Sequence, residues 1–169
     1  MKIERIWAMP NKWTFTIKPI KDLLKQEVYG LTIDPFCGKN SPAQVTNDLN
    51  PDVEATHHMD ALEFLRSLEA NYADCVLFDP PYSITQAKEC YDSFGADKFK
   101  ISPTSMKYWA EIKNEIARIL KPWGKAICFG WSSMGLGINR GFTMQRILLV
   151  PHGGSKNDTI VTVELKESK

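Results

Sequence analysis

The chain has 169 residues, of which 43% are hydrophobic and 24% are charged, and its formal net charge is +1. This length predicts a single domain over residues 1–169 with a core of its own, and the near-neutral charge argues against a protein that coats nucleic acid by charge alone. No apolar run approaches the roughly 20 residues of a membrane span, and the start lacks the apolar core of a signal peptide, so we expect a cytoplasmic protein with no membrane partner.

Apolar periodicity predicts helices and strands that alternate along the chain. Helices are expected at 19–28, 61–68 and 106–120, and strands at 31–34, 43–47, 73–78, 126–131, 142–150 and 159–165. Pro19 suits the first turn of the first helix, and Asp60 is placed to cap the second. The pattern predicts an α/β fold with a largely parallel sheet and an antiparallel C-terminal edge hairpin. Residues 1–29 would form a helix-bearing N-terminal extension.

Asp79-Pro80-Pro81-Tyr82 is the most informative motif of the chain. It follows the predicted strand 73–78, so the carboxylate falls at a strand's carboxyl end, where open α/β sheets place ligand sites. The two prolines fix φ and lack N–H groups, which stiffens the arm that carries the carboxylate and the aromatic ring. Such an arm suits the binding of a flat heterocycle that bears an amino group. The alternative is a proline-rich turn that merely closes the strand.

Cysteine and histidine usage gives no sign of a metal centre. The four cysteines are widely spaced and form no Cys-x-x-Cys pair: Cys37, Cys75, Cys90 and Cys128. His57 and His58 are adjacent, so on a strand they would point apart and could not chelate one ion together. We therefore expect no metal and reduced thiols.

The order of several short motifs resembles that of the adenine-N6 DNA methyltransferases, most closely the short stand-alone type found on phages and prophages. The segments that carry the resemblance are Thr16-Ile17-Lys18-Pro19, Asp34-Pro35-Phe36-Cys37-Gly38, Thr46-Asn47-Asp48-Leu49-Asn50-Pro51, His58-Met59-Asp60-Ala61-Leu62, Asp79-Pro80-Pro81-Tyr82, Lys121-Pro122-Trp123-Gly124-Lys125 and His152-Gly153-Gly154. Together they cover most of residues 14–165. The resemblance implies a Rossmann-like class I methyltransferase sheet, S-adenosylmethionine as the cofactor, and duplex DNA with a flipped adenine as the substrate.

The resemblance also implies a catalytic role for Asp79, Pro80, Pro81 and Tyr82. The Asp79 carboxylate and the Pro80 carbonyl would each accept one N–H group of the adenine amine, which would direct the nitrogen lone pair toward the methyl group for in-line transfer. Tyr82 would stack on the flipped base. The alternative role for Tyr82 is packing in the core.

On the cofactor side, the resemblance implies binding by Thr16, Lys18, Asp34, Pro35, Phe36, Gly38, Asp48, Asp60 and Ala61. Asp34 would face the methionine ammonium, and Gly38 would let the backbone approach the ligand. Asp48 would hold the ribose hydroxyls, by the same logic as the acid of dinucleotide folds. The simpler alternatives are an Asx turn for Asp48 and a helix cap for Asp60.

Three features depart from the family pattern. Asn40 stands where the loop usually has a second glycine, although asparagine adopts left-handed backbone more readily than most residues. The spacing between Gly38 and Asp48 is too short for a full crossover helix, so the first crossover helix should be reduced to a turn. There is no room for a separate target-recognition domain. Recognition would come from loops, chiefly 83–105, or from a specificity partner, and a homo-oligomer is a further option.

Two rival functions remain open on sequence. Motifs of the Asn/Asp-Pro-Pro-Tyr/Phe type also occur in enzymes that methylate the exocyclic amine of guanine in RNA. A methyltransferase-like protein without activity, which only binds nucleic acid, is the second rival. It would fail to bind S-adenosylmethionine tightly.

Overall fold

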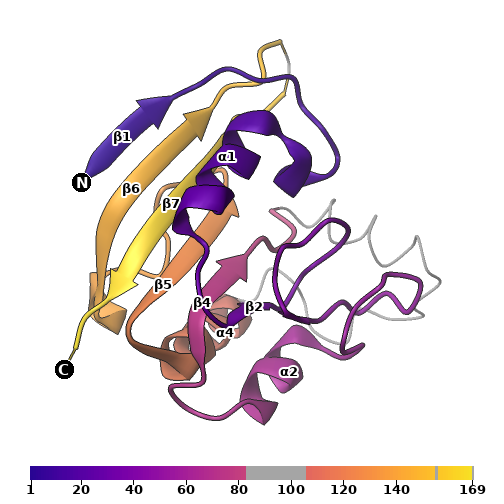
Figure 1. Cartoon of the computed structure of the whole chain (residues 1–169), viewed down its shortest axis with the longest axis vertical. Coiled ribbons are helices and arrows are strands. Elements are labelled where there is room, and N and C mark those ends of the chain that lie inside the picture. The colour runs from indigo at the N-terminus through magenta and orange to yellow at the C-terminus, as the bar shows by residue number, and fades with distance from the viewer. Residues whose placement is uncertain (83–105, 155, 169) are drawn as a thin grey trace.

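One mixed sheet organises the part of the chain that the computed structural model describes, which comprises residues 1–82, 106–154 and 156–168. The seven described strands are β1 (Lys2–Arg5), β2 (Thr32–Asp34), β3 (Val45–Thr46), β4 (Ala73–Phe78), β5 (Leu120–Gly130), β6 (Phe142–Val150) and β7 (Thr159–Lys166). They lie in the order β1-β6-β7-β5-β4-β2-β3 (Figure 1). β7 is antiparallel to both of its neighbours, and the other paired strands run parallel.

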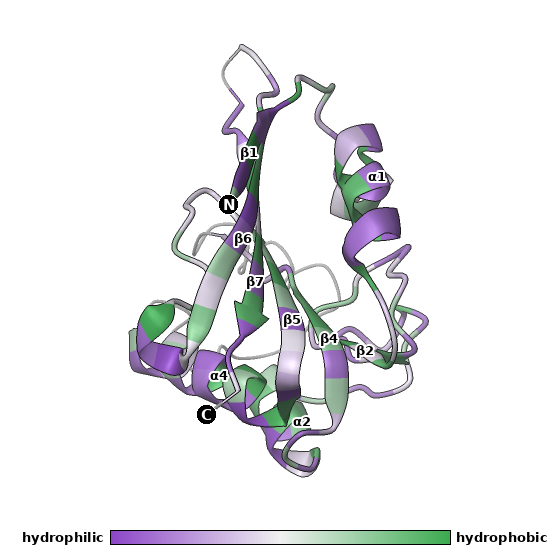
Figure 2. Ribbon diagram, turned by 60° about the vertical axis from the view of Figure 1, so that its left-hand side comes forward, coloured by the Kyte–Doolittle hydropathy of each residue, from purple (hydrophilic) through white to green (hydrophobic). Residues whose placement is uncertain are grey.

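Different helices cover the two faces of the sheet (Figure 2). They are α1 (Lys18–Glu27), α2 (Ala61–Ser67) and α4 (Met106–Ile119), with 3-10 turns η1 (Thr14–Thr16) and η2 (Ile138–Arg140). α1 and η1 pack on one face, and α2 and α4 pack on the other. Along β4, Cys75 and Leu77 pack into the core on the α1 side, while Val76 and Phe78 pack into the core on the side of α2 and α4. This strand is therefore buried on both faces, as is typical of a central parallel strand. None of the described helices has the length and apolar character needed to cross a membrane.

The predicted architecture is confirmed in its main features. The helices expected at 19–28, 61–68 and 106–120 are α1, α2 and α4, and Asp60 caps α2. The sheet is mostly parallel and contains the antiparallel hairpin of β6 and β7, although the hairpin is not at the edge of the sheet. The described residues 35–44, which connect β2 to β3, contain turns and no helix. The first crossover helix is therefore reduced to a turn, as the short spacing predicts.

Two features of the sheet differ from the sequence expectation. The first is β1, which pairs parallel with β6 and lies outside the C-terminal hairpin; three of its four residues are charged, so no apolar pattern marks it. The second is the start of β5 at Leu120 rather than at 126. Leu120 lies opposite Ala73, but the next paired residue, Lys125, lies opposite Cys75. The intervening residues 121–124 therefore form a bulge that sequence patterning takes for a break.

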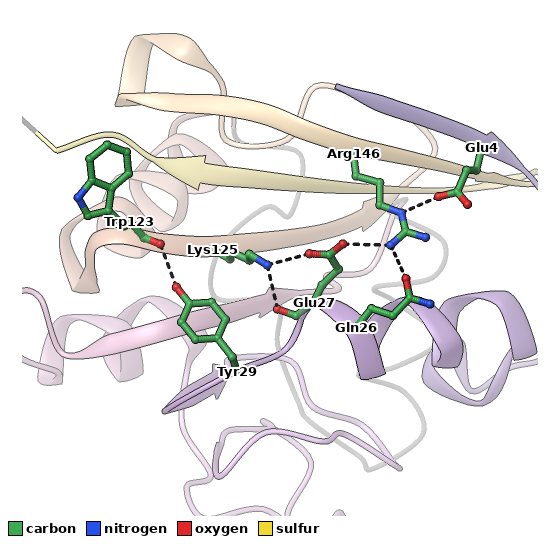
Figure 3. A network of polar contacts seen from close by, with 7 residues as sticks. All are labelled: Glu4, Gln26, Glu27, Tyr29, Trp123, Lys125 and Arg146. Atoms are coloured by element: carbon green, nitrogen blue, oxygen red, sulfur yellow. Dashed lines mark hydrogen bonds and ion pairs between the residues drawn. The ribbon is translucent and has the colours of Figure 1, made fainter.

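A polar network fastens β1 and α1 to the sheet (Figure 3). Arg146 on β6, which is 9% exposed, donates from Nε to Glu4 at 2.6 Å and from Nη1 to Gln26 and Glu27 at 2.9 and 3.0 Å. Lys125 on β5 donates to the second carboxylate oxygen of Glu27 at 2.8 Å. One guanidinium thus joins β6, β1 and the end of α1, and Glu27 extends the connection to β5.

We predict that Arg146→Met lowers the free energy of unfolding by about 2–3 kcal/mol, because Glu4 and Glu27 lose charge-assisted hydrogen bonds. Urea denaturation at neutral pH measures this change. The control is Lys107→Met, which removes an 85% exposed lysine at 4.0 Å from Glu111 and should change stability by less than about 0.5 kcal/mol. Equal effects of the two substitutions would show that the network does not hold the fold together.

Candidate active site

Asp34 organises the loop that follows β2. Its side chain is fully buried, and its Oδ1 accepts a hydrogen bond from the Phe36 N–H at 3.0 Å while its Oδ2 accepts one from the Ser41 hydroxyl at 2.6 Å. Asn40, just before Ser41, has a φ of 68°, so this asparagine adopts the left-handed backbone conformation that its residue type favours. These hydrogen bonds stabilise the short loop that connects β2 to β3 in place of the first crossover helix.

Gly38 and Asp48 meet across this loop. The Gly38 N–H donates to Asp48 Oδ2 at 2.9 Å, and Asp48 Oδ1 accepts from the Asn50 N–H at 2.9 Å. The second bond is the Asx turn that the sequence offers as an alternative role for Asp48. A Cβ placed on Gly38 would have no atom within 4 Å, so there is open space beside this backbone. A ligand could approach the chain closely there.

Asn47 is a residue that sequence analysis passes over. It is 1% exposed, and its Nδ2 donates to the carbonyl oxygens of Pro35 and Met59 at 3.1 and 3.0 Å, while its Oδ1 accepts from the Met59 N–H at 3.1 Å. One amide therefore joins the loops that follow β2 and β3 and the segment before α2. The available signal is an asparagine at the end of a predicted strand, where a buried amide must satisfy all its hydrogen bonds locally.

Asp60 acts as the N-cap of α2. Its Oδ1 accepts from the Leu62 and Glu63 N–H groups at 2.9 and 3.2 Å, and its Oδ2 accepts from the Tyr108 hydroxyl of α4 at 2.9 Å. Ala61, the first residue of α2, is buried. The capping role is thus observed, whereas cofactor contact by Asp60 and Ala61 stays a prediction.

The N-terminal segment reaches the motif through Thr14. The side chain of Thr14 in η1 lies close to Asp79 and Tyr82 and opposes the rise in their pKa values. Thr16 is exposed and donates to the Trp13 carbonyl at 2.8 Å, and the exposed Lys18 pairs with Asp22 at 2.7 Å. Sequence analysis names Thr16 and Lys18 for this segment, while the structure places Thr14 against the predicted catalytic aspartate.

Asp79 lies directly after β4, as the motif predicts, and its partly buried carboxylate accepts a hydrogen bond from the Tyr82 hydroxyl. Burial raises the pKa of Asp79 to about 6, although the hydrogen bonds from Tyr82 and Thr14 oppose this rise. Asp79 therefore carries a carboxylate that is mostly ionised at neutral pH and loses its charge under mildly acidic conditions.

Three carboxylates converge at the carboxyl ends of β2, β3 and β4. Burial raises the pKa of Asp34 to about 7, against hydrogen bonds from Ser41 and the Phe36 N–H, and the nearby charges of Asp79 and Asp48 add to the rise. Like charges that perturb each other must lie close together. The structure therefore brings the predicted catalytic acid and two predicted cofactor acids into one electrostatic environment, which would suit a cationic ligand.

An aromatic pocket of about 420 Å³ adjoins the motif. Pro80, Pro81 and Tyr82 line one side, and Trp109 and Trp131 belong to the rest of the wall. The Tyr82 and Trp131 rings pack edge to face with centroids 5.7 Å apart. The Asp79 carboxylate is not part of this lining; Tyr82 both lines the pocket and covers the carboxylate with its hydroxyl.

Phe36, one of the predicted cofactor-binding residues, packs against the rings of Phe78 and Trp109, with ring centroids 6.0 and 6.1 Å apart. A larger cavity of about 530 Å³ lies between β1 and α1, where Trp7 and Leu23 line it. That cavity contains none of the converging carboxylates. We therefore place the candidate active site at the carboxyl ends of β2 and β4, beside the smaller aromatic pocket.

Comparison with solved structures finds methyltransferases with this fold. The chain superposes on yhhF from Escherichia coli, named as a methyltransferase, with a TM-score of 0.55 and 12% identity over 90% of this chain and 84% of that one. TrmN from Thermus thermophilus gives a TM-score of 0.54 and 16% identity, and the match spans 89% of this chain but 49% of TrmN. The 1,6-didemethyltoxoflavin-N1-methyltransferase from Burkholderia thailandensis, solved with S-adenosylhomocysteine, gives a TM-score of 0.54 and 11% identity. The match covers 81% of this chain and 71% of that one.

No protein-family model and no curated protein sequence matches the chain. At these identities the structural matches show a shared fold, the Rossmann-like α/β fold of S-adenosylmethionine-dependent methyltransferases. The roles of individual residues have to be argued from the site itself.

We predict that Asp34→Asn stabilises the protein increasingly as the pH rises. The pKa of Asp34 is about 7 in the folded chain and ordinarily 3.8, so the folded state keeps a proton that the unfolded state has lost, and stability declines between these values. Asparagine keeps an acceptor for the Phe36 N–H. The free energy of unfolding of Asp34→Asn should exceed that of wild type by almost nothing at pH 4 and by at most on the order of 4 kcal/mol at pH 8.

Denaturant titrations between pH 4 and pH 8 measure the difference in the free energy of unfolding between Asp34→Asn and wild type. Asp22→Asn is the matched control, because the Lys18 hydrogen bond lowers the pKa of that exposed carboxyl and no gain with rising pH is expected. Identical pH dependence of wild type and Asp34→Asn would contradict the assignment of a buried, electrostatically strained carboxylate.

Proposed function

We propose that this protein transfers a methyl group from S-adenosylmethionine to the exocyclic N6 amine of adenine in DNA, by direct in-line attack on a flipped base. The observation that carries the proposal is the position of Asp79. Its carboxylate lies on a proline-stiffened arm at the carboxyl end of β4 and shares a hydrogen bond with Tyr82, which lines the aromatic pocket. The fold supports methyl transfer in general, and the resemblance of the motif to the adenine-N6 enzymes supports the substrate.

The loops beside Asp34 fit the proposed cofactor. The open space beside Gly38 would admit a ligand against the backbone. Asp34 would balance the methionine ammonium, and Asp48, whose oxygens each accept one backbone N–H, has lone pairs left for the ribose hydroxyls. S-adenosylmethionine, when bound, would supply a methyl group made electrophilic by a sulfonium sulfur. The remaining chemistry falls to Asp79, Pro80 and Tyr82.

The Tyr82 hydroxyl marks where the substrate amine would bind. It donates to Asp79 Oδ1, so an N–H group of the adenine amine would take the same place once Tyr82 turns away. The Pro80 carbonyl would accept the second N–H. With both hydrogens held, the nitrogen lone pair would point toward the methyl group that the cofactor supplies, and the ionised Asp79 would stabilise the developing ammonium and accept its proton.

The pocket would hold the flipped base between Tyr82 and the rings opposite it. At about 420 Å³ it is large enough for a purine, and its walls are mostly aromatic and apolar, as stacking requires. Its volume does not choose between adenine and guanine, so the identity of the base rests on the resemblance of the chain's motifs to those of the adenine-N6 enzymes. Methylation of DNA and RNA oligonucleotides, with identification of the modified nucleoside, tests this choice. N2-methylguanine as the product would select the RNA rival.

We predict that Asp79→Ala reduces kcat by roughly 10²–10³-fold or more, while the Kd for S-adenosylmethionine changes by less than a few-fold. Asp79→Asn should have a kcat between those of the wild type and Asp79→Ala, because the amide oxygen still accepts an N–H but carries no charge. Methyl transfer from labelled cofactor and calorimetric cofactor binding measure the two effects. Equal loss of turnover and cofactor binding would make Asp79 a structural residue.

We predict that Tyr82→Phe mainly shifts the pH profile, whereas Tyr82→Ala also weakens the binding of the substrate. Tyr82→Phe keeps the stacking face but removes the hydrogen bond that lowers the pKa of Asp79, so the acid limb of kcat/KM, expected near pH 6, should move to higher pH. Tyr82→Ala should lower kcat/KM for DNA further, by about 5- to 150-fold for the roughly 1–3 kcal/mol of lost stacking. If phenylalanine proves as damaging as alanine, stacking is the wrong role.

A further inference from the structure

Two lysines from distant parts of the sequence meet over the ring of Trp13. Lys12 Nζ lies 4.8 Å and Lys39 Nζ lies 5.3 Å from the ring centroid. Both distances are within the range of a cation–π interaction, which holds an ammonium in place electrostatically. We call Lys12, Trp13 and Lys39 the basic platform.

Both ammonium groups of the platform are available to an external anion. Lys12 and Lys39 are exposed, and Trp13 is half-buried. Across the described residues, neither lysine forms an ion pair with a carboxylate, whereas Lys18, Lys121 and Lys125 each have an acidic partner. In a chain with a net charge of only +1, two neighbouring lysines that have no ion-pair partner among the described residues form a local positive patch.

The platform is fixed next to the candidate active site. Trp13 precedes Thr14, whose side chain lies close to Asp79 and Tyr82, and its backbone is held by Asn11 Oδ1 and by the Thr16 hydroxyl at 3.0 and 2.8 Å. On the other side, Lys39 directly follows Gly38 of the loop after β2. The positive patch therefore lies beside both the proposed methyl acceptor site and the proposed cofactor loop.

We propose that the basic platform binds the phosphodiester backbone of the DNA strand beside the flipped nucleotide. This inference rests on the proposed function and names the surface that would position the strand. Two ammonium groups suit a ligand with repeated negative charges, and contact with phosphates fixes the register of a nucleic acid without reading its sequence. The indole keeps the two flexible side chains close together before the strand arrives, which reduces the entropy lost on binding.

The test is the salt dependence of DNA binding by the double variant Lys12→Ala/Lys39→Ala. A fluorescently labelled random-sequence duplex is titrated with protein saturated with S-adenosylhomocysteine, over a series of salt concentrations. Loss of two phosphate contacts should reduce the slope of log K against log[salt] by about 1.8, and should raise the Kd about tenfold or more at low salt. Lys12→Arg/Lys39→Arg, which preserves both charges, should bind like wild type.

The matched control is Lys21→Ala/Lys25→Ala, which removes the same charge from the exposed side of α1 and should leave the slope nearly unchanged. Equal slopes for the two double alanine variants would contradict DNA binding by the basic platform. Failure of the wild-type chain to bind the duplex would contradict it as well. A raised Kd for S-adenosylmethionine with unchanged DNA binding would also overturn it, since the lysines would then hold the methionine carboxylate. Salt-dependent binding that needs the platform, without methylation of any base, would instead defeat the proposed function.

Discussion

The burial of the Asp34 carboxylate is the constraint on which the candidate site depends. A carboxylate at the end of a buried parallel strand has lost its hydration, so the fold must supply donors or accept a protonated group. The structure supplies the Phe36 N–H and the Ser41 hydroxyl. Both donors belong to the loop that replaces the first crossover helix, so the same bonds that stabilise the charge also shape the loop.

The geometry of the loop then determines what surrounds it. The turn back toward β3 brings Gly38 onto Asp48 and lets Asn47 connect the loop to the segment before α2. A full crossover helix would place these residues much farther apart along the sheet. The short connection therefore gives a compact candidate site from few residues, held by hydrogen bonds between residues 10 to 12 positions apart in the chain.

Sequence reasoning recovers the elements and the motif because these depend on neighbours in the chain. Apolar periodicity gives α1, α2 and α4, the residue type gives the left-handed backbone of Asn40, and the strand before Asp79 places that carboxylate at an edge where ligands bind. Each of these inferences uses contacts or conformations within a few residues.

The features that sequence reasoning misses depend on residues far apart in the chain. β1 is held by Arg146, which lies 142 residues from Glu4, and no local pattern announces that pairing. Thr14 rather than Thr16 or Lys18 reaches the motif, because the 3-10 turn η1 determines which face of this segment meets β4. The sequence assigns Tyr82 a stacking role for its ring, but its hydroxyl also hydrogen-bonds to Asp79. Such choices are made by tertiary packing, which periodicity does not encode.

Under the proposed function, the repulsion between Asp34 and Asp79 would favour binding of the cofactor before the base. The charge on Asp79 raises the pKa of Asp34, so each carboxylate makes ionisation of the other less favourable. A ligand that brings a positive charge between them lowers both pKa values and removes this conflict. Of the two proposed ligands only the cofactor is cationic. Its binding would therefore favour the ionised Asp79 that the incoming amine requires, whereas adenine alone, which is neutral, would meet an acceptor still covered by Tyr82.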